Sequence, residues 1–251
     1  MIRALILLCA SLVPQIAQAQ EAVVLGLSQN RVQITANFDG SEILIFGAVK
    51  RETAIPDTAL EALITVEGPS GEVTVHRKDR RFGIWVNVET IRIDRAPSFY
   101  AVATTAPLRQ VLSHTEDLRH AITIPRAVRS VGSGAENPGD FTAALIRIRE
   151  NEGLYQTLEN TVAMEQDTLF RTRVALPANL TEGGYRTRVF LTRRGQVVAQ
   201  YETTIDVGKV GLEKWLYALS RDQSLIYGLL SLVVAVLAGW AASTGFRMLR
   251  G

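Results

Sequence analysis

The chain has 251 residues, a length that suits one or two domains. Apolar residues make up 47% of it and charged residues 21%, which excludes a disordered or strongly charged protein. A single cysteine excludes a disulfide scaffold and a cysteine-based zinc ribbon. The net charge of +2, without a long block of like charges, gives no indication of nucleic-acid binding.

Residues 1–19 have the pattern of a secretory signal peptide. An apolar run from Ala4 to Val13 comes after a basic residue, and Ala17-Gln18-Ala19 matches a cleavage site. The run is too short to span a bilayer, which needs about 20 residues, and this argues against the alternative of an uncleaved N-terminal anchor. Cys9 lies in this segment, so the mature chain is expected to contain no thiolate nucleophile or metal ligand.

A second apolar stretch, residues 224–246, has 23 residues and no charged side chain. As a helix it would be about 34 Å long, enough to cross a hydrocarbon core of about 30 Å. Arg247 and Arg250 come directly after it, as after a stop-transfer segment. Because a signal peptide directs the export of the mature chain, we expect a single-pass inner-membrane protein with a periplasmic body and a cytoplasmic tail at 247–251.

Small side chains recur at every fourth position of this expected span and would form a ridge that another helix can approach closely. The ridge residues are Ser231, Ala235, Gly239 and Ser243. They predict an integral membrane protein partner or self-association; the alternative is that small residues are simply common in such helices. Residues 211–221 are predicted to form an amphipathic juxtamembrane helix, and the aromatic anchors expected at the interface are Trp215, Tyr217 and Tyr227.

The body begins with short alternating or apolar segments separated by turn residues, which is typical of strands. Asp39-Gly40 indicates a hairpin turn between a strand at 32–35 and a central strand at 42–49. Residues 20–106 therefore predict an immunoglobulin-like β region.

Residues 107–160 change to a helical period and include a loop rich in Gly, Ser and Asn. Residues 161–208 return to strict alternation, which predicts half-buried antiparallel strands that complete the periplasmic domain. The predicted fold class is mainly β, an immunoglobulin-like sandwich with inserted helices and one C-terminal transmembrane helix.

Four arginines lie on the polar faces of two of these strands, and they allow two interpretations. They could form a cationic stripe for an anion, a lipid headgroup or an acidic partner, or they could pair across strands with Glu202 and Asp206. A three-residue turn at 193–195 would place Arg186 opposite Glu202 and favours the pairing. The four arginines are Arg171, Arg173, Arg186 and Arg188.

Residues 76–81 are the densest run of charge, with the sequence HRKDRR. The run could contact anionic lipid, but such runs are more often solvated hairpin tips, and we favour the latter.

His114, Asp117 and His120 have a spacing that could gather ligands around a metal on a helix, but the pattern is weak and predicts no metal site. The chain also has no motif of a serine hydrolase, zinc protease, P-loop or dinucleotide-binding enzyme. We therefore expect no catalytic residues, no cofactor and no enzymatic activity. An envelope hydrolase is the least favoured function.

Several segments together resemble the alphaproteobacterial putative transmembrane protein family: FDGSEILIFGAV (38–49), PLRQVLS (107–113), NEGLYQ (151–156), residues 169–200 with LPAN and GGYRTRV, and residues 215–247 with IYGLL and GW. The resemblance covers nearly the whole mature chain. It implies a signal peptide, an exported domain and one C-terminal span, and brings no catalytic residues. It also implies an association with sulfite-exporter-type permeases.

Together these observations predict a non-enzymatic interaction or accessory subunit, with a sulfite-exporter-type permease as the candidate partner. The alternative is a periplasmic ligand-binding or sensor module for an anion or a metal.

Overall fold

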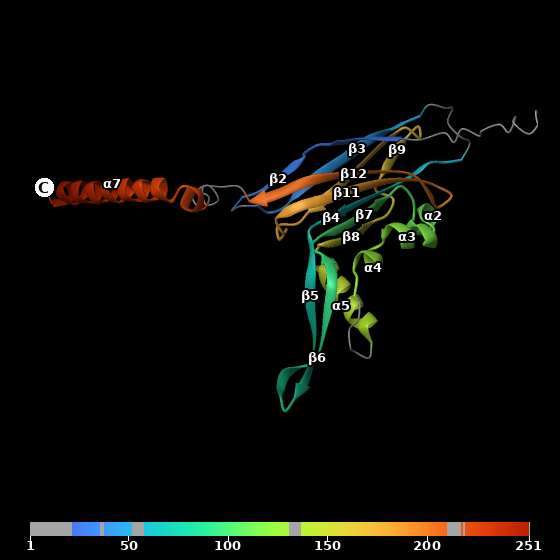
Figure 1. Ribbon diagram of the computed structural model, residues 1–251, viewed down its shortest axis with the longest axis horizontal. Coiled ribbons are helices and arrows are strands. Elements are labelled where there is room, and N and C mark those ends of the chain that lie inside the picture. The colour runs from blue at the N-terminus through green and yellow to red at the C-terminus, as the bar shows by residue number, and fades with distance from the viewer. Residues whose placement is uncertain are drawn as a thin grey trace, which may run out of the picture.

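The computed structural model describes residues 22–35, 38–51, 58–130, 137–209, 217 and 219–250. These residues form a mainly β body with two larger sheets, a projecting two-stranded hairpin and several short helices (Figure 1). The predicted signal peptide and most of the predicted helix at 211–221 lie outside the described residues.

The first sheet, sheet A, has four antiparallel strands in the order β1-β3-β10-β9. Its strands are β1 (Ala22–Leu27), β3 (Ser41–Lys50), β10 (Leu169–Leu176) and β9 (Ala163–Glu165). The predicted central strand at 42–49 is confirmed, because β3 pairs with β1 on one side and β10 on the other.

The second sheet, sheet B, has six strands in the order β2-β12-β11-β4-β7-β8, with parallel pairing at both edges and antiparallel pairing between. Its strands are β2 (Arg31–Ile34), β12 (Gln196–Lys209), β11 (Gly183–Arg193), β4 (Glu61–Glu67), β7 (Tyr100–Thr104) and β8 (Tyr155–Leu158).

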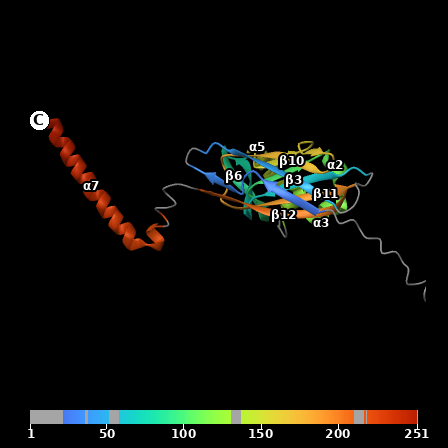
Figure 2. The ribbon, with the colours of Figure 1, turned by 90° about the horizontal axis from the view of Figure 1, so that it is seen from above.

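The two sheets share one hydrophobic core (Figure 2). Strand β10 alternates strictly, so that Phe170 and Val174 are buried while Arg171 and Arg173 are exposed, as its sequence predicts. From sheet B, Val189 adds a fully buried side chain to the same cluster.

Strand β11 is not the half-buried strand that its alternation predicts. All side chains from Thr187 to Thr192 are buried, including Arg188. The reason is helix α3 (His114–His120), which covers the second face of the strand: the rings of His120 and Phe190 lie 5.3 Å apart. A sequence period cannot show that a later element will cover the polar face.

The predicted three-residue turn between β11 and β12 is also wrong. Arg193 pairs with Gln196, so the turn has two residues, Arg194 and Gly195, both with positive φ. A register shift between Leu191 and Thr192 keeps the polar and apolar faces aligned despite the shorter turn. As a result Glu202 lies opposite Arg188 rather than Arg186.

The predicted hairpin at Asp39-Gly40 does not form either. Strand β2 pairs with β12 in sheet B, whereas β3 pairs with β1 and β10 in sheet A. The turn therefore carries the chain from one sheet to the other. Gly40 suits this turn because its φ is +116°, a value that side chains rarely adopt.

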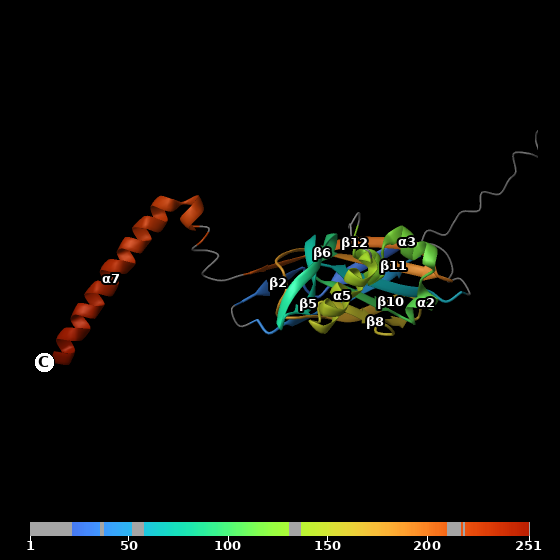
Figure 3. The ribbon, with the colours of Figure 1, turned by 90° about the horizontal axis from the view of Figure 1, so that it is seen from below.

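The described part of 107–160, the region predicted to be helical, contains the helices α2 (Leu108–Val111), α3, α4 (Ile124–Ala127) and α5 (Pro138–Asn151). Helix α3 begins at a capping Ser113, whose hydroxyl accepts a hydrogen bond from the Glu116 amide. It ends at Ala121 in the left-handed conformation. Helix α5 lies against the body (Figure 3). Its side chains Phe141 and Leu145 are buried in the shared core.

The hairpin of β5 (Ser70–Arg81) and β6 (Ile84–Pro97) extends the ladder of β4 and β7. Across the joint, the Gly68 amide donates to the Phe99 carbonyl and the Ser98 amide to the Pro69 carbonyl, both at 2.8 Å. The near half of the hairpin buries Ile91 and Ile93, and the far half projects from the body (Figure 1).

Helix α7 (Ser224–Arg250) covers the segment predicted to span the membrane. Within the described residues, none of the helices combines the length and the apolar character that crossing a bilayer requires.

Candidate interaction sites

The four arginines proposed as a stripe lie in two different sheets. Arg171 and Arg173 are exposed on β10 of sheet A, where Arg171 pairs with Glu165 at 3.0 Å. Arg186 and Arg188 are on β11 of sheet B. The structure therefore does not bring the four side chains together, and within sheet B the two arginines have different roles.

Arg186 belongs to an ion cluster around Glu67 at the base of the hairpin. The Glu67 side chain is only 6% exposed. Its Oε2 accepts a hydrogen bond from Arg186 Nη2, and its Oε1 accepts one from Arg95 Nη2 at 2.7 Å. The Ser70 hydroxyl donates to the same oxygen at 3.1 Å. The cluster joins β4, β11 and both strands of the hairpin, so its role is to hold the hairpin to sheet B.

The two guanidinium groups also set the protonation of this carboxylate. Burial by itself raises the pKa of Glu67, but hydrogen bonds and charge from Arg186 and then Arg95 outweigh burial and hold the pKa below its usual value. Glu67 is therefore ionised, and both oxygens are engaged by cations.

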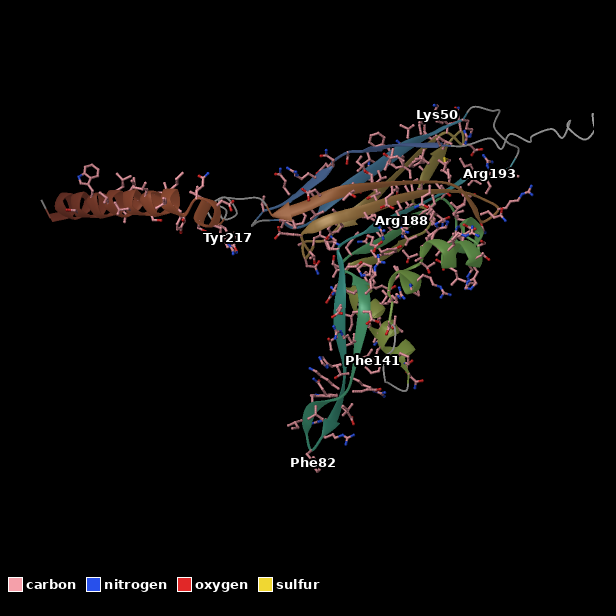
Figure 4. All side chains as sticks on the ribbon, in the orientation of Figure 1. Lys50, Phe82, Phe141, Arg188, Arg193 and Tyr217 are labelled. Carbon is pink, nitrogen blue, oxygen red and sulfur yellow. The ribbon has the colours of Figure 1, made fainter. Side chains whose placement is uncertain are left out.

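Arg188 is 7% exposed and lies inside the body rather than on a binding surface (Figure 4). Its Nη1 donates to the His120 carbonyl at 2.8 Å and its Nη2 to the Ala121 carbonyl at 3.3 Å. Nε donates to Thr65 Oγ1, and Nη2 also reaches the Tyr100 hydroxyl, both at 3.2 Å. The first two acceptors are carbonyls at the C-terminus of α3, where a cation is favoured. Arg188 thus ties α3 to the sheet.

Tyr100 completes this buried polar cluster. Its hydroxyl donates to the Ile122 carbonyl at 2.8 Å. Burial raises the pKa of Tyr100 to about 12, and the nearby Arg188 lowers it only in part. The phenol is therefore neutral at physiological pH and acts as a structural donor.

The spacing of His114, Asp117 and His120 does not create a metal site. Asp117 turns toward the chain after α3, accepting from the amides of Ile122 and Thr123 at 3.2 and 2.8 Å, and from the Thr123 hydroxyl at 2.9 Å. His120 Nε2 instead lies 3.3 Å from Glu116 Oε2. In the part of the chain that the structure describes, no three such side chains are placed to hold a metal ion.

The basic run at 76–81 lies on β5 and leads to the hairpin tip, close to its predicted position. The turn itself is Phe82-Gly83, with both residues at positive φ. Phe82 is fully exposed at the end of the hairpin (Figure 4), and Ile84 and Trp85 beside it are also exposed. The sequence indicated the charge here, but the apolar cluster was missed. Its only signal in the sequence is that Phe82, Ile84 and Trp85 follow one another closely at a turn.

The predicted helix-packing ridge falls on one continuous helix. Ser231, Ala235, Gly239 and Ser243 all lie within α7 and are exposed. A Cβ placed on Gly239 would meet no atom within 4 Å, so none of the described residues packs on this point of the ridge.

Of the predicted interface anchors, Tyr227 lies in α7 near its start, and Tyr217 lies before it. The Arg221 guanidinium donates to the Tyr217 hydroxyl at 2.9 Å and lies 5.8 Å from its ring centre. Trp215 lies outside the described residues.

A family model described as "Putative transmembrane protein (Alph_Pro_TM)" matches residues 22–248, which include the whole described body and nearly all of α7. The chain belongs to this family. Membership of the Alph_Pro_TM family confirms the resemblance seen in the sequence. No curated protein matches the chain.

Two solved structures show weak likeness to the Alph_Pro_TM chain. The sporulation control protein Spo0M from Bacillus subtilis matches with a TM-score of 0.29 and 10% identity, and the match covers 80% of this chain and 55% of the Spo0M chain. The chain thus spans about half the length of that protein. BslA, a bacterial hydrophobin, has a TM-score of 0.21 and 13% identity, covering 77% of this chain and 96% of its own.

The Glu67 cluster predicts a pH-dependent contribution to stability. Because its pKa is lowered in the folded state, the contribution is present above the usual value of 4.5 and is lost as the pH falls through the lower, folded value. Glu67→Gln should lower the free energy of unfolding at pH 7 by about 2 kcal/mol. Urea unfolding of the full chain in mild detergent should show that the difference in unfolding free energy between the wild type and Glu67→Gln becomes smaller toward pH 3. Glu165→Gln, which affects an exposed ion pair, is the control. If Glu67→Gln lowers the unfolding free energy equally at pH 7 and pH 3, the lowered pKa of Glu67 is contradicted.

Arg188 is predicted to matter for folding and not for ligand binding. Arg188→Met keeps most of the side-chain volume but removes the guanidinium hydrogen bonds to the part-buried His120 and Ala121 carbonyls and to Thr65 and Tyr100, so the free energy of unfolding should fall by about 2–3 kcal/mol. Arg171→Met on sheet A should change it by less than about 0.5 kcal/mol. Thermal and urea unfolding of the two variants compare them directly, and equal stability of both would refute the structural role.

Proposed function

We propose that this chain is a single-pass inner-membrane protein whose β body faces the periplasm and serves as a non-enzymatic interaction subunit. The observation that carries the proposal is the surface of α7. Its apolar side chains are exposed all around the helix: Leu225, Leu229, Leu232, Val233, Val236, Leu237 and Trp240. A helix that is apolar on every side is stable in a bilayer or a protein core, and the described body does not cover it.

Three further points support this location. The family to which the chain belongs is described as transmembrane. The sequence from 224 to 246 is free of charge, and Arg247 and Arg250 come directly after it. The signal-peptide pattern at 1–19 would export the body and leave residues 247–251 in the cytoplasm.

We also propose that the body is an elaborated immunoglobulin-like sandwich. In support, β1-β3-β10-β9 has the order of strands A, B, E and D, and β12-β11-β4 has the order G, F and C. Near the start of β11, the F position, the Tyr185 hydroxyl donates to the Thr181 carbonyl at 2.8 Å, the hydrogen bond of a tyrosine corner.

The proposed partner is a second membrane protein, or a second copy of this chain, packed against the small-residue ridge of α7. Side chains as small as Ala235 and Gly239 let two helix backbones come close, which is how helices associate where no hydrophobic driving force acts between them. A sulfite-exporter-type permease is the candidate, on the basis of family association alone.

The alternative of an anion or metal sensor has less support. Arg186 and Arg188 use their donors on Glu67 and on α3, and Asp117 uses its oxygens on the loop after α3. A saturable response of the full chain to phosphate or Zn²⁺ would revive this alternative.

Fusion of a reporter after residue 251 tests the proposed topology. An alkaline phosphatase fused there should be inactive and a fluorescent protein fluorescent, because the C-terminus would face the cytoplasm. Alkaline carbonate should leave the full chain in the membrane pellet. An active phosphatase, or release by carbonate, would contradict the anchor.

The ridge makes a separate prediction. Ala235→Leu with Gly239→Leu should reduce crosslinked partner recovered from intact cells by at least about fivefold, because large side chains keep the helices apart. Val233→Leu, on the opposite face of the helix, is the control. If the ridge variant recovers as much partner as the control, α7 does not bind through this face.

A further inference from the structure

The tip of the β5–β6 hairpin concentrates large apolar side chains that no described residue covers. Phe82 is fully exposed at the turn, and Trp85 and Ile84 are 68% and 64% exposed. Val88 adds a fourth exposed apolar side chain on the same strand. A soluble surface rarely gathers such side chains at one protruding point unless they meet a partner.

Basic side chains flank this apolar tip. Arg80 lies directly opposite Trp85 in the strand register, and Arg81 lies opposite Ile84. Residues 76–90 carry four basic and two acidic side chains, a net charge of +2. Arg77 and Arg81 have acidic neighbours at 3.8 and 3.6 Å, whereas Lys78 forms no ion pair with any described residue. The tip therefore combines aromatic groups with an excess of positive charge.

The near half of the hairpin holds this tip at a fixed distance from the body. The ladder continues through the Gly68 and Ser98 hydrogen bonds, and the Glu67 cluster pins the strand base. Beyond the base, β5 has twelve residues, so the tip stands about 40 Å from the joint. A two-stranded ribbon is only marginally stable alone in water, so an exposed apolar end gains from a surface that covers it.

The base of the hairpin lies at the end of the sandwich from which the chain leaves toward α7. Glu67, at the end of β4, pairs with Arg186 of β11, and the neighbouring Gly183 pairs with Val207 near the end of β12. Pro69 of the joint lies against Gly183, since a Cβ there would be 2.5 Å from Pro69 Cγ. The hairpin base and the C-terminal end of β12 therefore lie at the same end of the body.

We propose that the hairpin tip binds the surface of an anionic bilayer. Phe82, Trp85 and Ile84 enter the headgroup region, where aromatic rings are favoured, and the basic residues beside them contact lipid phosphates. The convex, two-sided tip suits a deformable lipid surface, because a protein partner would need an acidic groove that encloses both faces. This inference goes beyond the membrane anchor, because the tip would contact lipid whether or not α7 spans the bilayer.

A fluorescent label beside the tip tests the proposal on the full chain. Cys9 is the only cysteine, so Asn87→Cys in a Cys9→Ser background carries one NBD group while leaving the apolar tip intact. The protein is reconstituted with vesicles of phosphatidylcholine alone or with about 30% phosphatidylglycerol, which gives a negative surface potential. A label at Thr204, on exposed β12, is the positional control.

We expect the Asn87 label to shift to the blue and to be quenched by doxyl-labelled lipid in the anionic vesicles, at least about threefold more than in neutral ones. Phe82→Ser with Trp85→Ser should abolish the quenching, and Arg80→Gln with Arg81→Gln should reduce it and remove its salt dependence. Val24→Ser with Leu169→Ser, two exposed apolar positions of sheet A, should leave it unchanged. Circular dichroism of each variant confirms an intact fold.

Equal quenching at Asn87 and Thr204, or no dependence on phosphatidylglycerol or on the aromatic residues, would overturn the proposal. Crosslinking of the tip to an acidic protein without lipid quenching would overturn it in favour of a protein partner. Carbonate extraction of the same vesicles reports on α7 separately, so failure of the tip and failure of the anchor give different results.

Discussion

The buried ion cluster at Glu67 is the interaction on which the arrangement of the body depends. A single carboxylate with 6% exposure accepts from guanidinium groups on β6 and β11, and it stands where β4 becomes β5. Removing the two arginines would leave the buried Glu67 carboxylate uncompensated, a much larger loss than that of an exposed pair. The hairpin and sheet B are therefore joined at this one carboxylate.

A second buried ion, the cation Arg188, holds the helical region to sheet B as Glu67 holds the hairpin. Its donors meet two carbonyls at the end of α3, so the helix is fixed over β11 without a carboxylate. This explains why β11 is buried on both faces. It also means that two of the arginines considered for a ligand are used inside the fold, and that recognition depends on other surfaces.

Much of the fold could be predicted from sequence, and the failures have physical causes. Strand β10 shows a clean period of two because solvent covers one of its faces, and its sequence predicts this correctly. Strand β11 has the same period, but α3 covers its polar face, a tertiary contact that no local pattern encodes. The turn at Asp39-Gly40 has the residues of a hairpin, yet it links two sheets because long-range pairing decides where each strand lies.

The candidate sites also divide into those that a local sequence pattern indicates and those that depend on tertiary contacts. The ridge on α7 and the basic run at 76–81 depend on spacing within one element, so sequence located both. The Glu67 cluster joins residues more than a hundred positions apart, and only the strand register brings them together. The apolar tip was missed because its residues resemble an ordinary strand until the structure shows that nothing described packs on them.

The joint at Gly68 and Pro69 has a mechanical consequence. Because β4 runs into β5 with hydrogen bonds kept across the joint, a force on Phe82 is transmitted along the strand to the middle of sheet B. The hairpin is thus a lever arm continuous with sheet B, able to set the tilt of the sandwich above whatever surface its end touches.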